Sequence, residues 1–172
     1  MKILVFSDSH QRNNYMKAAI DMHKAVGKID CIFHLGDGVK DLEYLSPQIP
    51  VCYVDGNYEE YVTSYLARKN LKSEAVIELA GYRFFLTHGH SYRVKGGFEH
   101  LIEAAKRKNV DVVVFGHTHE QYYEYIPPEG EDERGLYIFN PGSISRPRDN
   151  VFSYGIIEIR NNNILISHAS IQ

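Results

Sequence analysis

The sequence predicts an α/β domain in which one part of the sheet structure is parallel and another antiparallel. In the first third, short apolar runs alternate with a segment of helical spacing, which is typical of parallel strands joined by helices. In the second half, strand-like runs follow one another across short Gly- and Asn-containing turns, which is typical of hairpins. The length of 172 residues and the hydrophobic fraction of 44% suit one compact domain over residues 1–172.

The first third supplies the parallel part. Residues 3–6 are a short apolar run, which favours a strand buried on both faces. Residues 13–26 carry apolar positions at helical spacing, and we expect Asn13 or Asn14 to cap this helix and Gly27 to end it. Further strands are predicted at residues 31–35 and 51–54, with a short helix at 39–45. Strand, helix and strand in this order predict right-handed crossovers.

The second half supplies the hairpins. Residues 74–79 and 82–86 predict two strands joined around Ala80-Gly81. An amphipathic helix at 98–108 and a buried strand at 110–115 follow. The remaining predicted elements are strands at 122–126 and 136–139 around an acidic Pro/Gly-rich loop at 127–135, and strands at 153–159 and 163–169 around an Asn161-Asn162 turn.

Bulk properties exclude several classes of protein. The net charge of −3 argues against a general electrostatic hold on nucleic acid, although bound metal could still attract a nucleotide. Cys31 and Cys52 lie in predicted strands without CxxC spacing, so we expect two reduced thiols in the core of a cytoplasmic protein. No apolar run approaches the ~20 residues of a membrane span, so no membrane association is expected. The 13 tyrosines and the C-terminal strands leave a homo-oligomer open.

Five polar clusters each follow a predicted strand. They are Asp8-Ser9-His10, Gly36-Asp37, Gly56-Asn57, His88-Gly89-His90 and Gly116-His117-Thr118-His119. Alone, an Asp in such a place is ordinary turn or capping chemistry, but two pairs of closely spaced histidines do not arise from composition. Imidazole and carboxylate without thiolate suit Mn²⁺, and also Ni²⁺, Zn²⁺, Fe or Co²⁺. The number of candidate ligands favours two divalent ions sharing a carboxylate, ~3.5–4 Å apart.

The order of these clusters resembles the calcineurin-like metallophosphoesterase superfamily. The small size and the segment 140–143, followed by Arg146 and Arg148, are similar to its compact YfcE/MJ0936-type phosphodiesterase branch. The resemblance runs from Ile3 to about Arg148. It implies a four-layer α/β/β/α sandwich of two mixed sheets flanked by helices. It also implies a phosphodiesterase that hydrolyses small phosphodiesters or nucleotides by in-line attack of a metal-bound hydroxide.

The resemblance also assigns ligands. It implies that one metal is bound by Asp8, His10 and His119, and the second by Asn57, His88 and His117, with Asp37 as the bridge. A carboxylate suits the bridge because it offers two anionic oxygens. Manganese is the metal we expect. His10 and His119 each need an acceptor for the second ring nitrogen, which the sequence does not identify.

Asn57, Tyr58 and His90 are the expected catalytic residues. The amide of Asn57 could donate to a phosphoryl oxygen. Many relatives have a proton-donating His directly after the Gly-Asn pair, where this chain has Tyr58. Phenols donate a proton less readily than imidazolium at neutral pH, so we expect a preference for esters with good leaving groups. His90 could orient substrate, donate a proton or brace its loop. His34 is expected to be a satisfied core histidine or one that supports a ligand residue from outside the metal site.

Two other functions compete with this hypothesis. One is a non-catalytic Vps29-like scaffold on the same fold, in which lost metal ligands accompany a partner-binding surface. The chain keeps the ligand types at all seven positions, which favours the enzyme. The other is a DNA-processing nuclease of the same superfamily. Such chains carry extra domains and a basic surface, which this sequence does not predict.

Overall fold

Two five-stranded sheets form the centre of the protein. The computed structural model describes residues 1–45, 48–66, 71–128, 130 and 134–171. The first sheet has the order β10-β9-β1-β2-β3. Its strands are β1 (Lys2–Phe6), β2 (Cys31–His34), β3 (Val51–Tyr53), β9 (Ser153–Arg160) and β10 (Asn163–Ser170). The second sheet has the order β4-β5-β6-β8-β7. Its strands are β4 (Glu74–Leu79), β5 (Tyr82–Thr87), β6 (Val112–Val114), β7 (Gln121–Ile126) and β8 (Leu136–Pro141).

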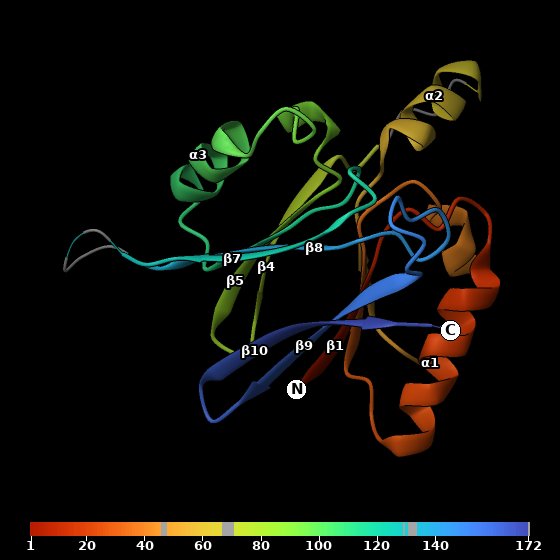
Figure 1. Cartoon of the computed structure of the whole chain (residues 1–172), viewed down its shortest axis with the longest axis horizontal. Coiled ribbons are helices and arrows are strands. Elements are labelled where there is room, and N and C mark those ends of the chain that lie inside the picture. The colour runs from red at the N-terminus through yellow and green to blue at the C-terminus, as the bar shows by residue number, and fades with distance from the viewer. Residues whose placement is uncertain (46–47, 67–70, 129, 131–133, 172) are drawn as a thin grey trace.

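The helices lie outside the sheets. They are α1 (Asn13–Val26), α2 (Asn57–Leu66), α3 (Glu99–Arg107) and the two short 3-10 helices η1 (Val39–Tyr44) and η2 (His90–Tyr92). Figure 1 shows α1 and α3 on opposite sides of the paired sheets. Within the described residues, none of the helices is long and apolar enough to cross a membrane.

Three apolar clusters hold the layers together. The inner faces of the two sheets meet around Phe33 and Phe84, whose ring centroids are 5.5 Å apart. On the outer face of the first sheet, α1 buries Met16 against Phe6. On the outer face of the second, α3 buries Leu101 in a cluster of the same kind. The order of layers is therefore α/β/β/α, which confirms the fold class that the resemblance implied.

The strand pairing differs from the expectation of one parallel and one antiparallel half. Both sheets are mixed: β1, β2 and β3 are parallel, and so are β5, β6 and β8. The antiparallel pairs are the hairpins β4–β5, β7–β8 and β9–β10 and the pair of β1 with β9. The second half is therefore not purely antiparallel. The reason is that α3 carries the chain from β5 to β6 as a crossover, so that these strands run in the same direction.

Several local expectations are corrected. Arg12 occupies the N-cap of α1 without a side-chain hydrogen bond, and Asn13 is already helical, so the predicted asparagine cap is wrong. Gly27 ends α1 as predicted. The predicted helix at 39–45 is the 3-10 helix η1, and α2 was not predicted. Cys31 is buried but Cys52 only partly; both are free. Residues 129 and 131–133 of the predicted acidic loop lie outside the described residues.

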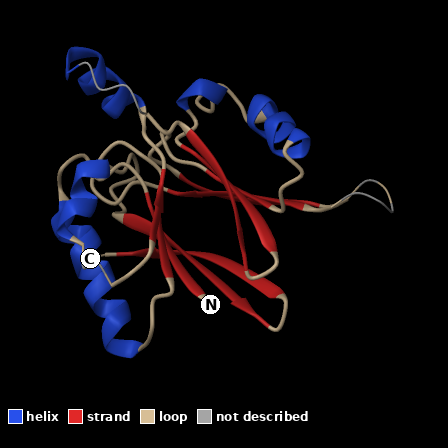
Figure 2. Ribbon diagram, turned by 180° about the vertical axis from the view of Figure 1, so that it is seen from behind, coloured by secondary structure: helices blue, strands red, loops and turns tan. Residues whose placement is uncertain are grey.

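The two sets of parallel strands place the polar clusters. The loops after β1, β2 and β3 carry the first three clusters, and the loops after β5 and β6 carry the two histidine clusters. Figure 2, seen from behind, shows loops crowded at one end of the sheets. Because parallel strands end at the same edge, side chains that are far apart in the sequence meet there.

Candidate metal centre

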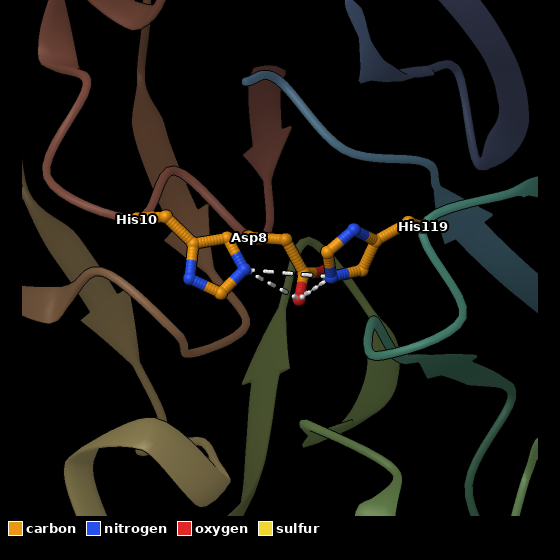
Figure 3. Close-up of side chains that lie close together, drawn as sticks. All are labelled: Asp8, His10 and His119. Atoms are coloured by element: carbon orange, nitrogen blue, oxygen red, sulfur yellow. Dashed lines mark hydrogen bonds and ion pairs between the residues drawn. The ribbon is translucent and has the colours of Figure 1, made fainter. Parts of the chain in front are cut away.

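Asp8, His10 and His119 converge on one point (Figure 3). The Nε2 atom of His119 lies 3.1 Å from Oδ1 of Asp8, and Nε2 of His10 lies 4.0 Å from the same oxygen. The two Nε2 atoms are 3.4 Å apart. Asp8 and His10 come from the loop after β1, and His119 comes from the loop between β6 and β7. This is one of two groups of ligand atoms, among the described residues, that are compact enough for a metal ion.

Asp8 also belongs to the second group, with Asp37 and His88. The Nε2 atom of His88 lies 3.5 Å from Oδ2 of Asp37 and 3.9 Å from Oδ1 of Asp8. Oδ1 of Asn57 is 3.2 Å from the same Nε2, and the His117 ring centroid is 5.0 Å from that of His88. The structure thus gathers the predicted ligand residues in one place, and both Asp8 and Asp37 lie between the two groups of histidines.

The surroundings of the Asp8 carboxylate suit a divalent cation. Its carboxylate is fully buried. Oδ2 of Asp8 accepts hydrogen bonds from the Ser7 hydroxyl at 2.6 Å and from the backbone N–H of His117 at 3.1 Å. Oδ1 has no hydrogen bond, because the close approach of His119 lacks hydrogen-bond geometry. A buried, unsatisfied anionic oxygen is costly. With imidazole nitrogens of His10, His88 and His119 facing it, this oxygen is suited to a divalent metal.

The charge state of Asp8 supports this fit. Burial by itself raises the pKa of the Asp8 carboxyl, but the imidazoles of His119 and His88 outweigh burial and hold that pKa below its usual range. Burial lowers the pKa of His117 to about 4, with the charges of His88 and Lys95 adding to the effect. At neutral pH, Asp8 is therefore an anion and His117 a neutral imidazole, the forms that ligate metals.

Backbone carbonyls fix the orientation of two imidazoles. Nδ1 of His88 lies 2.6 Å from the Leu35 carbonyl oxygen, and Nδ1 of His119 lies 2.6 Å from that of Arg146. A carbonyl oxygen only accepts, so each Nδ1 carries the proton. When the imidazole is neutral, as metal binding requires, its Nε2 therefore directs a lone pair into the centre. These two carbonyls are the outer acceptors that sequence reasoning does not identify.

The backbone at the ligands is strained. Positive φ angles occur at non-glycine residues of the centre: Asp8 (54°), His10 (45°), Asp37 (54°), His117 (69°) and His119 (60°). Such angles are uncommon outside glycine and cluster at functional sites. At Gly116 a Cβ would collide with the Ser7 hydroxyl and crowd the Asp8 carboxylate. Position 116 therefore requires a glycine, because the side chains of Ser7 and Asp8 approach its backbone too closely for a Cβ.

The Glu59 carboxylate holds the backbone of two loops at the candidate centre, a role that was not predicted from the sequence. Its Oε2 accepts from the N–H groups of Asp37 at 2.8 Å and Gly56 at 2.9 Å. Its Oε1 accepts from Gly38 at 2.7 Å and Val39 at 3.1 Å. One carboxylate therefore ties the loop carrying Asp37 to the start of α2. A Glu three residues after Gly56 is half of a capping box, a signal that could have found it.

Serine side chains hold the loop of Asp8 in the same manner. The hydroxyls of Ser143 and Ser145 donate to the Asp8 carbonyl at 2.9 and 3.0 Å. The Asn140 amide donates to the Gly116 carbonyl at 2.9 Å. These bonds fix the loop that carries Asp8 and the loop that carries the last histidine cluster.

Tyr58 and His90 lie at the rim. The Tyr58 side chain is partly exposed, its hydroxyl accepts from Nε2 of Gln11 at 2.7 Å, and its ring is 6.2 Å from that of His10. Nε2 of His90 contacts Oε1 of Glu60 at 2.9 Å, and its ring is 6.0 Å from that of His117. Both predicted catalytic side chains are therefore within reach of a molecule bound at the centre.

His34 is a buried histidine with both ring nitrogens satisfied, as expected. Nε2 contacts the Ser9 hydroxyl at 3.1 Å, and Nδ1 accepts from the Gly36 N–H at 3.3 Å. Burial lowers the pKa of His34 to about 4. In the unfolded chain the pKa of His34 returns to its ordinary value near ~6.5. Between pH 6.5 and about pH 4, His34 is therefore protonated in the unfolded chain and neutral in the folded chain.

His34 is therefore expected to make the metal-free protein less stable as pH falls from 6.5 towards 4. Between pH 7 and pH 5 its contribution to the free energy of unfolding falls by about 2 kcal/mol. Urea unfolding of the wild type and of His34→Asn at both pH values measures this. The difference in stability between the two proteins should narrow by that amount at pH 5. A difference that is the same at both pH values would contradict the assignment.

Comparisons with known proteins agree with this geometry. Residues 1–162 match the model of the calcineurin-like phosphoesterase superfamily domain. The chain is 27% identical over 168 residues to phosphodiesterase MJ0936 of Methanocaldococcus jannaschii, covering 92% of this chain and 93% of that protein. A crystal structure of a predicted phosphoesterase from Streptococcus pneumoniae superposes with a TM-score of 0.71 at 27% identity, covering 98% and 88% of the two chains.

The fold is also found in Vps29. A Vps29 double mutant from Entamoeba histolytica superposes with a TM-score of 0.69 at 20% identity over the whole of both chains. At this identity the likeness concerns the fold alone.

Proposed function

The chain belongs to the calcineurin-like phosphoesterase superfamily, and from this membership we propose that it is a metal-dependent phosphodiesterase acting on small phosphodiesters or nucleotides. The observation that carries the proposal is the buried Oδ1 of Asp8, which lacks a hydrogen bond and faces the Nε2 atoms of His10, His88 and His119. Such an arrangement is unfavourable without a cation and favourable with one.

Two divalent ions are proposed, with manganese as the first choice. Asp8, His10 and His119 would hold one ion; Asn57, His88 and His117 would hold the other. Asp37 would bridge them. When bound, the ions would activate water and neutralise negative charge on the phosphoryl group. Asp8, which belongs to both groups of ligand atoms, would contribute negative charge to both positions.

The protein's own side chains would orient the ester and move its proton. With Oδ1 of Asn57 directed at His88, the amide NH₂ remains available to donate to a phosphoryl oxygen. The Tyr58 ring lies 6.2 Å from that of His10 and the His90 ring 6.0 Å from that of His117, so either side chain could protonate a leaving oxygen. The contact with Glu60 holds the His90 ring in place, so that its position does not depend on bound substrate.

A metal-panel assay tests the proposed function. After treatment with a chelator, the protein is reloaded with Mn²⁺, Ni²⁺, Zn²⁺ or Co²⁺ and given bis-p-nitrophenyl phosphate and p-nitrophenyl phosphate. We expect hydrolysis of the diester to return with metal, most strongly with Mn²⁺, and to exceed hydrolysis of the monoester. A Vps29-like scaffold would hydrolyse neither ester with any of the metals, and that outcome would refute the proposal.

Tyr58→His is expected to widen the range of leaving groups. Imidazolium protonates an alkoxide more readily than a phenol does. The variant should therefore gain ~10-fold or more in kcat on an alkyl phosphodiester, whereas p-nitrophenyl esters, whose leaving group needs little protonation, should change little. Tyr58→Phe serves as the matched control for loss of the hydroxyl. An alkyl-ester rate that does not rise in the histidine variant would show that Tyr58 does not occupy the proton-donating position.

A further inference from the structure

A cavity of about 450 Å³ lies beside the candidate metal centre. It is lined by the segment from Val94 to Phe98, between η2 and α3, and by the start of β7. Thr118 lines the cavity and stands between two of the proposed ligands, His117 and His119. The loop that presents these imidazoles therefore also forms part of the cavity wall.

Two cations line this cavity. Lys95 forms no ion pair with any residue that the structure describes. Lys95 lines the same cavity as Thr118, which stands between the proposed ligands His117 and His119. The Arg148 guanidinium is 3.6 Å from the Glu120 carboxylate, and both side chains are exposed. Such an exposed pair is weak, so Arg148 can turn to an anion at little cost. The cavity thus offers one unpaired and one weakly paired positive charge against a single lining carboxylate, that of Glu120.

Two aromatic side chains, Phe98 and Tyr122, line the cavity. The ring centroids of Phe98 and Tyr122 are 4.4 Å apart, and Phe98 packs against buried Phe115 with centroids 5.2 Å apart. The Tyr122 hydroxyl donates to Glu124, which fixes the ring. Two braced rings provide an apolar surface suited to a flat ring. The volume is within the range of small-molecule sites and exceeds the space that one phosphate group needs.

We propose that this cavity binds one ester arm of the phosphodiester, and that it selects an arm carrying both a flat ring and a second phosphate. The substrate class is a nucleotide diester with an additional terminal phosphate. Lys95 and Arg148 bind that phosphate, and Phe98 and Tyr122 contact the base. This inference rests on the proposed function and goes further, because a diester with two plain aryl arms would use only the apolar part of the cavity.

A matched pair of substrates tests the selection. Thymidine 5′-(p-nitrophenyl phosphate) and its 3′-phosphorylated form release the same leaving group and differ only by the second phosphate. With the manganese-loaded protein, we expect the 3′-phosphate to lower KM about tenfold with little change in kcat. In Lys95→Met and Arg148→Gln the ratio of the two KM values should approach one. Lys28→Met, a change of an exposed lysine that does not line the cavity, should preserve the ratio.

Direct binding separates this inference from the proposed function. Calorimetry with thymidine 3′,5′-bisphosphate requires no turnover, and we expect the Kd to rise about tenfold in Lys95→Met. Equal KM values for the two esters, or binding unaffected by Lys95→Met, would overturn the inference even if the enzyme is active. If the bisphosphate binds in a Lys95-dependent manner but no ester is hydrolysed, the inference about the cavity is supported and the proposed activity is refuted.

Discussion

The Asp37→Asn variant is expected to lose hydrolysis of every ester tested, by at least ~10³-fold in kcat/KM. In the structure, Oδ1 of Asp37 accepts from the Tyr58 N–H at 2.8 Å, while Oδ2 faces His88 at 3.5 Å and His10 at 4.0 Å. An amide must place its NH₂ group at one of these positions. That NH₂ group would then face either the Tyr58 N–H or the proposed cations, both of which repel it. In both cases residue 37 also loses its second anionic oxygen.

Steady-state kinetics on the manganese-loaded variant and its metal content by mass spectrometry measure this effect. We expect fewer than two bound ions and no rate above the metal-free background. Asp21→Asn, an exposed position on α1, is the matched control and should behave as wild type. Wild-type rates in the Asp37 variant would show that Asp37 is not a bridge.

Glu59→Gln is expected to destabilise the protein and to weaken its hold on metal. The Glu59 carboxylate accepts from four backbone N–H groups at 2.7–3.1 Å. A glutamine retains one accepting oxygen and turns an NH₂ group towards the other donors. The loss of charge-assisted bonds and the unpaired donors should cost about 3 kcal/mol. For a protein of this size that corresponds to a fall in Tm of roughly 6–12 °C.

The affinity of Glu59→Gln for metal should also fall, by ~10–100-fold, because the positions of Asp37 and Asn57 both depend on the loops that Glu59 joins. Thermal unfolding and a manganese titration measure the two effects. Glu103→Gln removes an exposed carboxylate paired with Arg107 on α3 and should change neither quantity appreciably. If Glu59→Gln leaves both Tm and manganese affinity at wild-type values, the carboxylate does not position the centre.

The positions of the polar clusters could be predicted because strands and turns have strong local signals. The apolar run before Asp8 and the run before His117 each identify a strand, and ligands after parallel strands meet at one edge. The mixed pairing in each sheet could not be predicted in this way, because partners of a strand are selected by packing across the whole domain. The pairing of β6 with β8 joins strands that are not consecutive in the chain.

The parts that escaped prediction have weak sequence signals. The carbonyls of Leu35 and Arg146 orient two imidazoles, but every residue carries a carbonyl, so composition does not mark them. The start of α2 was missed because residues 57–62 lack a clear apolar face, although Gly56 and Glu59 form half of a capping box. The cavity beside the candidate centre is built from loops around Lys95 and Thr118, whose shape depends on tertiary contacts.

Anomalous diffraction from crystals soaked in Mn²⁺ tests the central claim most directly, because it locates metal without reference to activity. The account predicts two manganese peaks ~3.5–4 Å apart. One would lie among Asp8, His10 and His119, and the other near His88, with a carboxylate between them. A single peak, or none within reach of these side chains in a well-ordered crystal, would contradict a dinuclear centre.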